Sequence, residues 1–173
     1  MADDHAIARL GETGRALEAD ECAELAHAAG RLIDLDELDR TGSGSARLLW
    51  RTPHSEAWLN TWWEARDTGF HDHAGSCVGV HVLAGRAANE PLTVDGPRQV
   101  NWFGPGESFS FIGAGIHRMD HAAGAVTIHV YSPPIRSIGH YELADGALRR
   151  LRCPPDEESP PSPVLTASLA ERS

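Results

Sequence analysis

FHDHAGSCVGVHVLAG, residues 70–85, is the stretch of sequence that decides the fold. It contains two histidines, His71 and His73, at positions i and i+2 around Asp72. On an extended segment these side chains point to the same side, so both imidazoles can reach one metal ion. Two surface histidines in a loop give the same pattern, and the surroundings must decide between these interpretations. The residues from Val80 to Gly85 predict a strand that ends in a turn.

The composition limits the class of protein. With 173 residues the chain is long enough for one domain with a sizeable core. No apolar run approaches the length of a membrane span, and the start of the chain lacks a secretory signal. Three cysteines at unrelated spacings, Cys22, Cys77 and Cys153, fit neither a disulfide framework nor a thiolate zinc site. The formal charge of −10 argues against a nucleic-acid partner. We expect a monomer in the reducing cytoplasm.

Three stretches divide the chain. In residues 1–40 the segment from Leu17 to Leu38 has the apolar spacing of a helix, with Asp20 as the expected N-cap. Residues 41–152 contain short strands broken by glycine and proline, which predicts an all-β sandwich or barrel. We expect residues 153–173, rich in proline and charge, to form a disordered tail. The expected strands are residues 47–51, 57–65, 77–83, 99–103, 108–112, 125–131 and 139–143.

The spacing of histidines and glycines resembles the two motifs of cupins, the family of double-stranded β-helix barrels. Gly85 follows His73 at the distance of the first motif, and Val78 stands where that motif carries a glutamate ligand. Gly106 precedes His117 at the distance of the second motif, whose proline and glycine are replaced here. The resemblance implies an all-β cupin barrel that has lost its carboxylate and keeps three imidazoles, those of His71, His73 and His117.

A site of three imidazoles has distinct chemistry. Three neutral ligands leave a divalent ion at its full charge, with open coordination positions on one face. Such a site favours an anionic donor from the substrate, and a thiolate fits because metal binding deprotonates thiols. Three histidines and a water also form a known type of zinc site. The ligand set alone therefore does not choose between iron and zinc.

The strand expected after His117 carries three polar side chains on one face. Thr127, His129 and Tyr131 alternate along it, so a hydroxyl, an imidazole and a phenol can form a hydrogen-bond relay. A strand whose polar groups face water would show the same alternation. In a cupin this strand crosses the barrel beside the third histidine, which favours a relay that points inward.

Together these motifs resemble the cysteine dioxygenase (thiol dioxygenase) family over about residues 48–143. They are HDH at 71–73, GAGIHR at 113–118 and HVYSPP at 129–134. The resemblance implies one non-haem Fe(II) per chain, held by the three histidines, and a relay formed by Thr127, His129 and Tyr131. It also implies an arginine that binds the substrate carboxylate, for which Arg51 is the best match and Arg136 the alternative.

The activity implied by this resemblance is the oxidation of a small thiol carboxylate by O2 to a sulfinic acid. We expect L-cysteine as the substrate. The alternative is 3-mercaptopropionate or another small thiol, because relatives that oxidise it place their arginine differently. Two other classes stay open: a zinc or manganese cupin that acts as a hydrolase or isomerase, and a non-catalytic sensing cupin.

One departure from the family concerns the tyrosine of the relay. Mammalian members carry a cysteine at the position of Val78, where it forms a thioether with that tyrosine. Here Cys77 is one residue away, and strand alternation predicts that it faces the other side of the sheet. We therefore expect Tyr131 to be unmodified.

Overall fold

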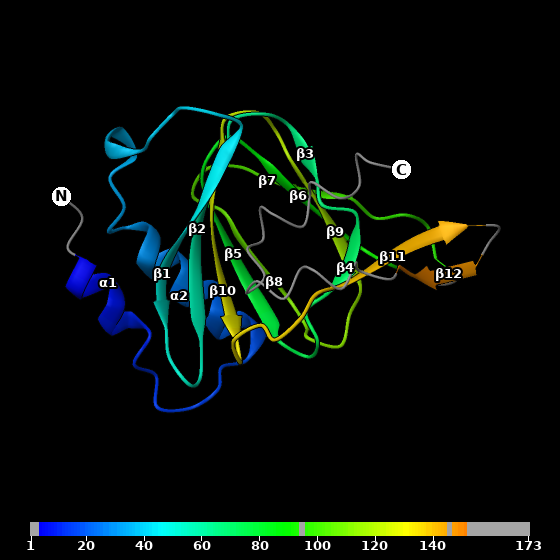
Figure 1. Cartoon of the computed structure of the whole chain (residues 1–173), viewed down its shortest axis with the longest axis horizontal. Helices are drawn as coiled ribbons and strands as arrows, with labels where there is room; N and C mark the ends of the chain where they lie inside the picture. Colours follow the sequence, from blue (N-terminus) through cyan, green and yellow to red (C-terminus); the bar gives the residue numbers. More distant parts are fainter. Residues whose placement is uncertain (1–3, 94–95, 145–146, 152–173) are drawn as a thin grey trace.

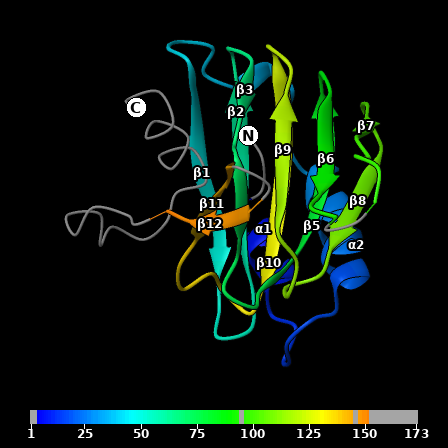
Figure 2. The same ribbon diagram turned by 90° about the vertical axis from the view of Figure 1, so that its right-hand side faces the viewer.

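Two antiparallel sheets face each other in the computed structural model, which describes residues 4–93, 96–144 and 147–151 (Figure 1). The first sheet has five strands in the order β1-β2-β10-β5-β8. The second has the order β12-β11-β4-β9-β6-β7, with β3 paired to β9. Figure 2 shows β9 and β6 side by side in this second sheet. The predicted all-β architecture is confirmed.

Seven of the described strands, β1, β2, β5, β7, β8, β10 and β11, overlap the predicted ranges. Those of the first sheet are β1 (Gly44–Arg51), β2 (Glu56–Trp62), β5 (Cys77–Ala84), β8 (Ser108–Phe111) and β10 (Ala125–Ser132). Those of the second are β3 (Arg66–Asp67), β4 (Phe70–Asp72), β6 (Ala87–Pro91), β7 (Asn101–Phe103), β9 (His117–His121), β11 (Gly139–Ala144) and β12 (Ala147–Arg150). The predicted ranges do not include β3, β4, β6, β9 or β12, and of these only β4 contains a β-branched or aromatic residue, Phe70.

The helices are α1 (Asp4–Leu10), α2 (Ala19–Gly30) and the short 3-10 helix η1 (Leu35–Glu37). The expected helix from residue 17 to 38 is therefore too long, and its N-cap is Glu18 rather than Asp20. Glu18 and Glu21 form a reciprocal capping box, in which the side chain of each accepts a hydrogen bond from the backbone N–H of the other. Asp20 lies inside that turn, where its carboxylate accepts a hydrogen bond from Ser110 of β8 at 2.6 Å.

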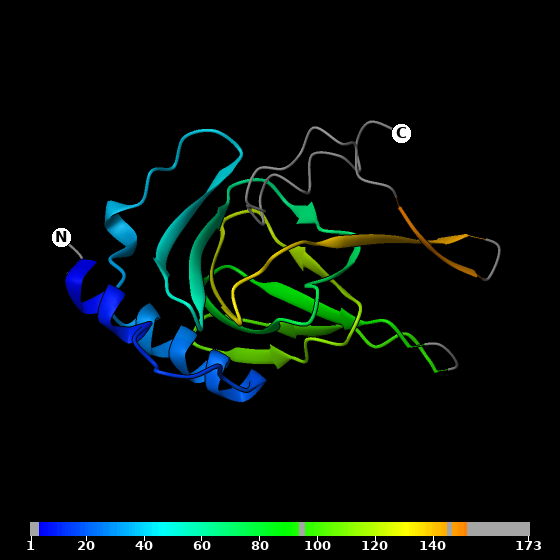
Figure 3. The same cartoon turned by 60° about the horizontal axis from the view of Figure 1, so that its bottom comes forward.

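Helix α2 lies on the outside of the first sheet, and the β11–β12 hairpin projects on the opposite side (Figure 3). The contact with β5 is close because Gly79 has no side chain: a Cβ there would lie 2.0 Å from the backbone nitrogen of Ala23. The opposite face of β5 presents Val78, Val80 and Val82 to the barrel interior. The alternation of β5 thus separates a helix-packed outer core from an inner core.

Steric constraints explain why the last residue of the first cupin motif is a glycine. Gly85 adopts a φ of +68°, and a Cβ at this position would lie 2.6 Å from the Cα of Ala125. Both the conformation and the close approach to β10 favour glycine. None of the described helices is long and apolar enough to cross a membrane. The tail predicted at residues 153–173 lies outside the described residues.

Candidate metal centre

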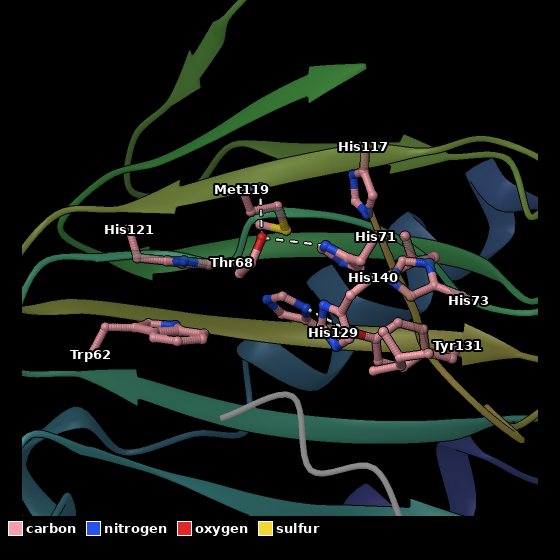
Figure 4. A pocket seen from close by; sticks show the side chains of 12 residues that line it. Trp62, Thr68, His71, His73, His117, Met119, His121, His129, Tyr131 and His140 are labelled. Atoms are coloured by element: carbon pink, nitrogen blue, oxygen red, sulfur yellow. Dashed lines mark hydrogen bonds between the residues drawn. The ribbon is translucent and has the colours of Figure 1, made fainter. Parts of the chain in front are cut away.

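Three buried histidines of the second sheet meet inside the barrel, where Figure 4 shows their rings pointing toward one another. His71 of β4 is the register partner of His117 of β9, and His73 directly follows β4. One ring nitrogen of each lies within 4.8 Å of those of the other two. The ring centroids are 4.9 Å (His71–His73), 4.6 Å (His71–His117) and 5.0 Å (His73–His117) apart. The sequence prediction that the three imidazoles face one point agrees with this geometry.

Hydrogen bonds fix which nitrogen of two rings faces the common centre. His71 Nδ1 donates to the carbonyl oxygen of Gly69 at 3.0 Å, and His117 Nδ1 donates to Asn89 Oδ1 at 2.7 Å. The lone pair of each neutral ring is therefore on Nε2. His117 Nε2 is buried without a hydrogen-bond partner among the described residues. A metal ion bound at the centre would satisfy this nitrogen.

Burial keeps the three imidazoles neutral. Desolvation lowers the pKa of His71 to about 4 and is also the largest cause that lowers the pKa of His73 and His117 well below 6.5. A neutral imidazole offers its lone pair to a metal ion at pH 7. No carboxylate joins the cluster among the described residues, and Val78 lines the cavity at the position of the cupin glutamate. The donor set therefore fits a divalent ion of borderline softness.

A second row of buried side chains lies beside the three histidines. Thr127 Oγ1 is 3.0 Å from His129 Nε2, and His129 Nδ1 is 3.1 Å from the Tyr131 hydroxyl. The Tyr131 ring packs against His73 with centroids 5.1 Å apart. Burial lowers the pKa of His129 to about 3 and raises the pKa of Tyr131, so both groups are neutral at pH 7. The relay points inward, the orientation favoured by the sequence.

A small cavity lies at this centre. Apolar and imidazole side chains form its wall: Trp62, Thr68, His71, His73, Val78, His117, Met119, His121, His129, Tyr131, Ile138 and His140. Seven of these, including Trp62, His121 and His140, lie beyond the predicted set of site residues. His121 stacks on Trp62 with ring centroids 3.8 Å apart, and the ring of His140 lies 6.3 Å from that of His71.

Neither arginine of the sequence prediction is part of this wall. Arg51 ends β1, with its side chain 39% exposed, and donates from Nε to Glu56 Oε2 at 2.6 Å. Glu56 is buried and is the register partner of both Arg51 and Tyr131. Arg51 therefore lies on the inner face of the first sheet, at the edge of the site. Its strand β1 is separated from β10, the strand of Tyr131, by β2. Arg136 is exposed.

Three further residues at or near the site are not predicted from the sequence. Trp62 and Glu56 occupy inner-face positions of β2, and Asn89 lies in β6. Period-2 alternation along the expected strand 57–65 could have placed Trp62 inside the barrel. Glu56 lies just before that range, and Asn89 has no local signal because its strand is not predicted.

Cys77 faces away from the cavity, as strand alternation predicts. Its Sγ lies 3.6 Å from Sγ of Cys22 in α2, whereas its neighbour Val78 lines the cavity. The sheet therefore separates the Cys77 thiol from Tyr131. This arrangement supports the expectation of an unmodified tyrosine.

The comparisons with known proteins agree with this geometry. The family model described as cysteine dioxygenase type I matches residues 14–144. The matched range contains the three clustered histidines, the relay of β10 and Arg51. Among curated proteins, none matches this chain.

Several solved structures are similar to this chain at low identity. A protein from Bacillus halodurans has a TM-score of 0.50 and 15% identity, over 61% of this chain and 82% of that chain. A protein with a double-stranded β-helix domain from Klebsiella pneumoniae has a TM-score of 0.48 and 16% identity, over 62% and 94% of the two chains. An oxalate decarboxylase variant from Bacillus subtilis has a TM-score of 0.45 and 15% identity, over 53% and 26%. The likeness concerns the barrel fold alone.

Proposed function

This chain belongs to the cysteine dioxygenase type I family, and we propose that it is a thiol dioxygenase that uses Fe(II) and O2. Its substrate in this proposal is a small thiol carboxylate, L-cysteine in the first place, and the product is the sulfinic acid. The observation that carries the proposal is the cluster of three buried, neutral imidazoles, which no carboxylate of the described residues joins. Such a donor set leaves the charge of the metal uncompensated and favours a thiolate from the substrate.

Each part of the site has a role in this proposal. His71, His73 and His117 would hold one iron ion per chain, and His71 and His117 would bind through Nε2 because their Nδ1 atoms donate to Gly69 and Asn89. When bound, iron supplies the oxygen chemistry that adds both atoms of O2 to the sulfur. Tyr131, held by His129, would donate a hydrogen bond to the reacting groups in the cavity.

The carboxylate of the substrate would be held by Arg51. Its position on the inner face, in line with Glu56 and Tyr131, supports this assignment. The described hydrogen bond of Arg51 uses Nε, and a guanidinium can bind a carboxylate through its Nη atoms. Arg136 is the alternative partner, and with it 3-mercaptopropionate becomes the favoured substrate.

Two functions compete with this proposal. One is a zinc or manganese cupin that acts as a hydrolase or isomerase, and the other is a sensing cupin without catalysis. The metal separates them from the proposal, which requires iron. We also propose that the protein acts as a monomer in the cytoplasm.

The decisive experiment is anaerobic reconstitution of the metal-free protein with Fe(II), followed by a panel of thiols. Oxygen uptake and sulfinate formation are measured for L-cysteine, 3-mercaptopropionate and cysteamine. We expect one equivalent of O2 per sulfinate formed. Stoichiometric zinc in the purified protein, with no oxygen uptake for any thiol after iron loading, would exclude the proposal.

A further inference from the structure

We propose that Trp62 sets the direction of the hydrogen bonds in the relay, so that the Tyr131 hydroxyl proton is left to point into the cavity. Trp62 is the last residue of β2, and its buried side chain lines the cavity. Its indole Nε1 lies 3.1 Å from Thr127 Oγ1. The catalytic meaning of this inference rests on the proposed function, whereas the direction of the bonds does not.

The argument starts from the chemistry of the indole group. An indole N–H can only donate a hydrogen bond, so Thr127 Oγ1 must accept from Trp62. Thr127 is fully buried, and its described hydrogen-bond partners are Trp62 and His129. Its own hydroxyl proton therefore has one acceptor within reach, His129 Nε2 at 3.0 Å.

The hydrogen bond from Thr127 then determines the tautomer of the His129 imidazole. A neutral imidazole carries one N–H and one lone pair, so a ring that accepts at Nε2 must hold its proton on Nδ1. His129 Nδ1 lies 3.1 Å from the Tyr131 hydroxyl and donates to its oxygen. Because this oxygen accepts from His129, the O–H proton of Tyr131 does not point back into the relay. It is available on the side of the cavity, where the ring packs against His73.

The reverse direction is disfavoured by the same tryptophan. If Tyr131 donated to His129, then His129 Nε2 would donate to Thr127, and Thr127 Oγ1 would accept from both of its described partners, which leaves its own proton without an acceptor. A buried hydroxyl proton without an acceptor costs free energy. His121 supports the arrangement from the other side, because its ring stacks on the indole of Trp62 at 3.8 Å and an interplanar angle of 15° (Figure 4). Trp62 is therefore a positioning residue that acts through Thr127.

The first test measures the tautomer of His129 without any turnover. The full chain, labelled with ¹⁵N-histidine and loaded with Zn(II), is studied by long-range ¹⁵N–¹H NMR, and His129→Gln assigns the signal. We expect the proton on Nδ1 of His129. A proton on Nε2 in the wild-type protein would overturn the proposal, whether or not the protein oxidises a thiol.

The second test is a double-mutant cycle on the iron-loaded protein with L-cysteine. Trp62→Phe keeps an aromatic ring and removes the N–H, and we expect kcat to fall by about three- to tenfold, the worth of one neutral hydrogen bond, with KM little changed. In a Tyr131→Phe background the same change should have no further effect on kcat. An equal loss in both backgrounds would show that Trp62 acts independently of Tyr131 and would refute the proposal.

The neighbouring tryptophan provides a matched control. Trp63 donates its indole N–H to the carbonyl oxygen of Asp39 at 3.0 Å, away from the cavity. Trp63→Phe removes the same chemical group outside the barrel interior and should leave kcat and the His129 tautomer unchanged. If Trp62→Phe does not fold, the tautomer of the wild-type protein still decides the direction.

Discussion

Asn89 holds His117 from behind the metal centre: its side-chain oxygen accepts the Nδ1 proton of the imidazole at 2.7 Å, and both residues are buried. The ring of Phe111 stacks on the same imidazole at 4.3 Å with an interplanar angle of 7°. The hydrogen bond to Asn89 and the stacking on Phe111 together hold the His117 ring in one orientation. His117 Nε2 is thereby directed at the centre before a metal ion binds.

The first prediction tests this support. Asn89→Leu keeps a similar volume and removes the acceptor, so the affinity for Fe(II) should fall by about 10- to 100-fold. Anaerobic titration of the metal-free protein against a competing chelator measures the affinity. Asn101 is the exposed register partner of Asn89 in β7, and Asn101→Leu is the control that should leave the affinity unchanged. Equal affinities in the two variants would contradict the role of Asn89.

The second prediction concerns the ligands themselves. His71→Ala, His73→Ala and His117→Ala should each abolish iron retention, because two remaining imidazoles hold a divalent ion weakly. Metal analysis after gel filtration measures retention, and circular dichroism checks the fold. His81→Ala should retain iron, because His81 faces away from the cavity and bonds Ser108 at 2.8 Å. We expect His121→Ala to retain iron as well. Stoichiometric iron in the His117→Ala variant would refute the ligand set.

The fold and the centre follow from patterns that are local in the sequence. Alternation places His71 beside His73 and turns Cys77 away from Val78, because a strand has a period of two residues. Asn89 and Glu56 could not be predicted, because their roles depend on the register between strands far apart in the chain. Asn89 meets His117 only through the pairing of β6 with β9, and Glu56 meets Tyr131 only through the pairing of β2 with β10.

The third prediction concerns the pH dependence of the metal-free protein. Burial lowers the pKa of His71 to about 4 and that of His129 to about 3, against 6.5 for an exposed histidine. Below pH 6.5 the unfolded chain therefore binds protons that the folded protein does not. The free energy of unfolding should fall as the pH falls from about 6.5 toward 4, by at most about 1.4 kcal/mol per pH unit for each such group.

Urea denaturation between pH 4.5 and pH 7.5, with a chelator present, measures this dependence. His121→Phe removes one histidine whose pKa burial lowers well below 6.5, and it keeps a ring that can stack on Trp62. The slope of the free energy of unfolding against pH should be smaller in this variant. Identical slopes would show that protonation of His121 does not contribute to acid unfolding.

The fourth prediction concerns the end of the relay. Tyr131→Phe keeps the packing against His73 and removes the phenol O–H, so iron should still bind while kcat falls by about 10²–10⁴-fold. Oxygen uptake with L-cysteine measures the rate. Full activity in this variant would remove Tyr131 from the mechanism. Intact-mass analysis of the wild-type protein should show no loss of two hydrogens, because the sheet separates Cys77 from Tyr131.

The last prediction concerns the substrate. If Arg51 holds the carboxylate, L-cysteine should be oxidised faster than 3-mercaptopropionate, and both should exceed cysteamine, which lacks a carboxylate. Arg51→Ala should raise KM for L-cysteine and leave cysteamine oxidation nearly unchanged, since cysteamine never makes the lost contact. The Arg51 side chain is 39% exposed whereas that of Glu56 is 1% exposed, so Arg51→Ala also leaves a buried carboxylate without its partner.

The double variant Arg51→Ala with Glu56→Gln separates these two effects. Glu56→Gln removes the buried charge, so the double variant should recover the stability that Arg51→Ala loses while KM for L-cysteine stays high. The ratio of kcat/KM for L-cysteine to that for cysteamine is the measurement that decides, because it cancels a general loss of folded enzyme. Two results together would show that Arg136 binds the carboxylate. The ratio in the double variant would equal that of the wild-type protein, and Arg136→Ala would lose its activity with L-cysteine but not with cysteamine. The alternative substrate, 3-mercaptopropionate, would then be the better assignment.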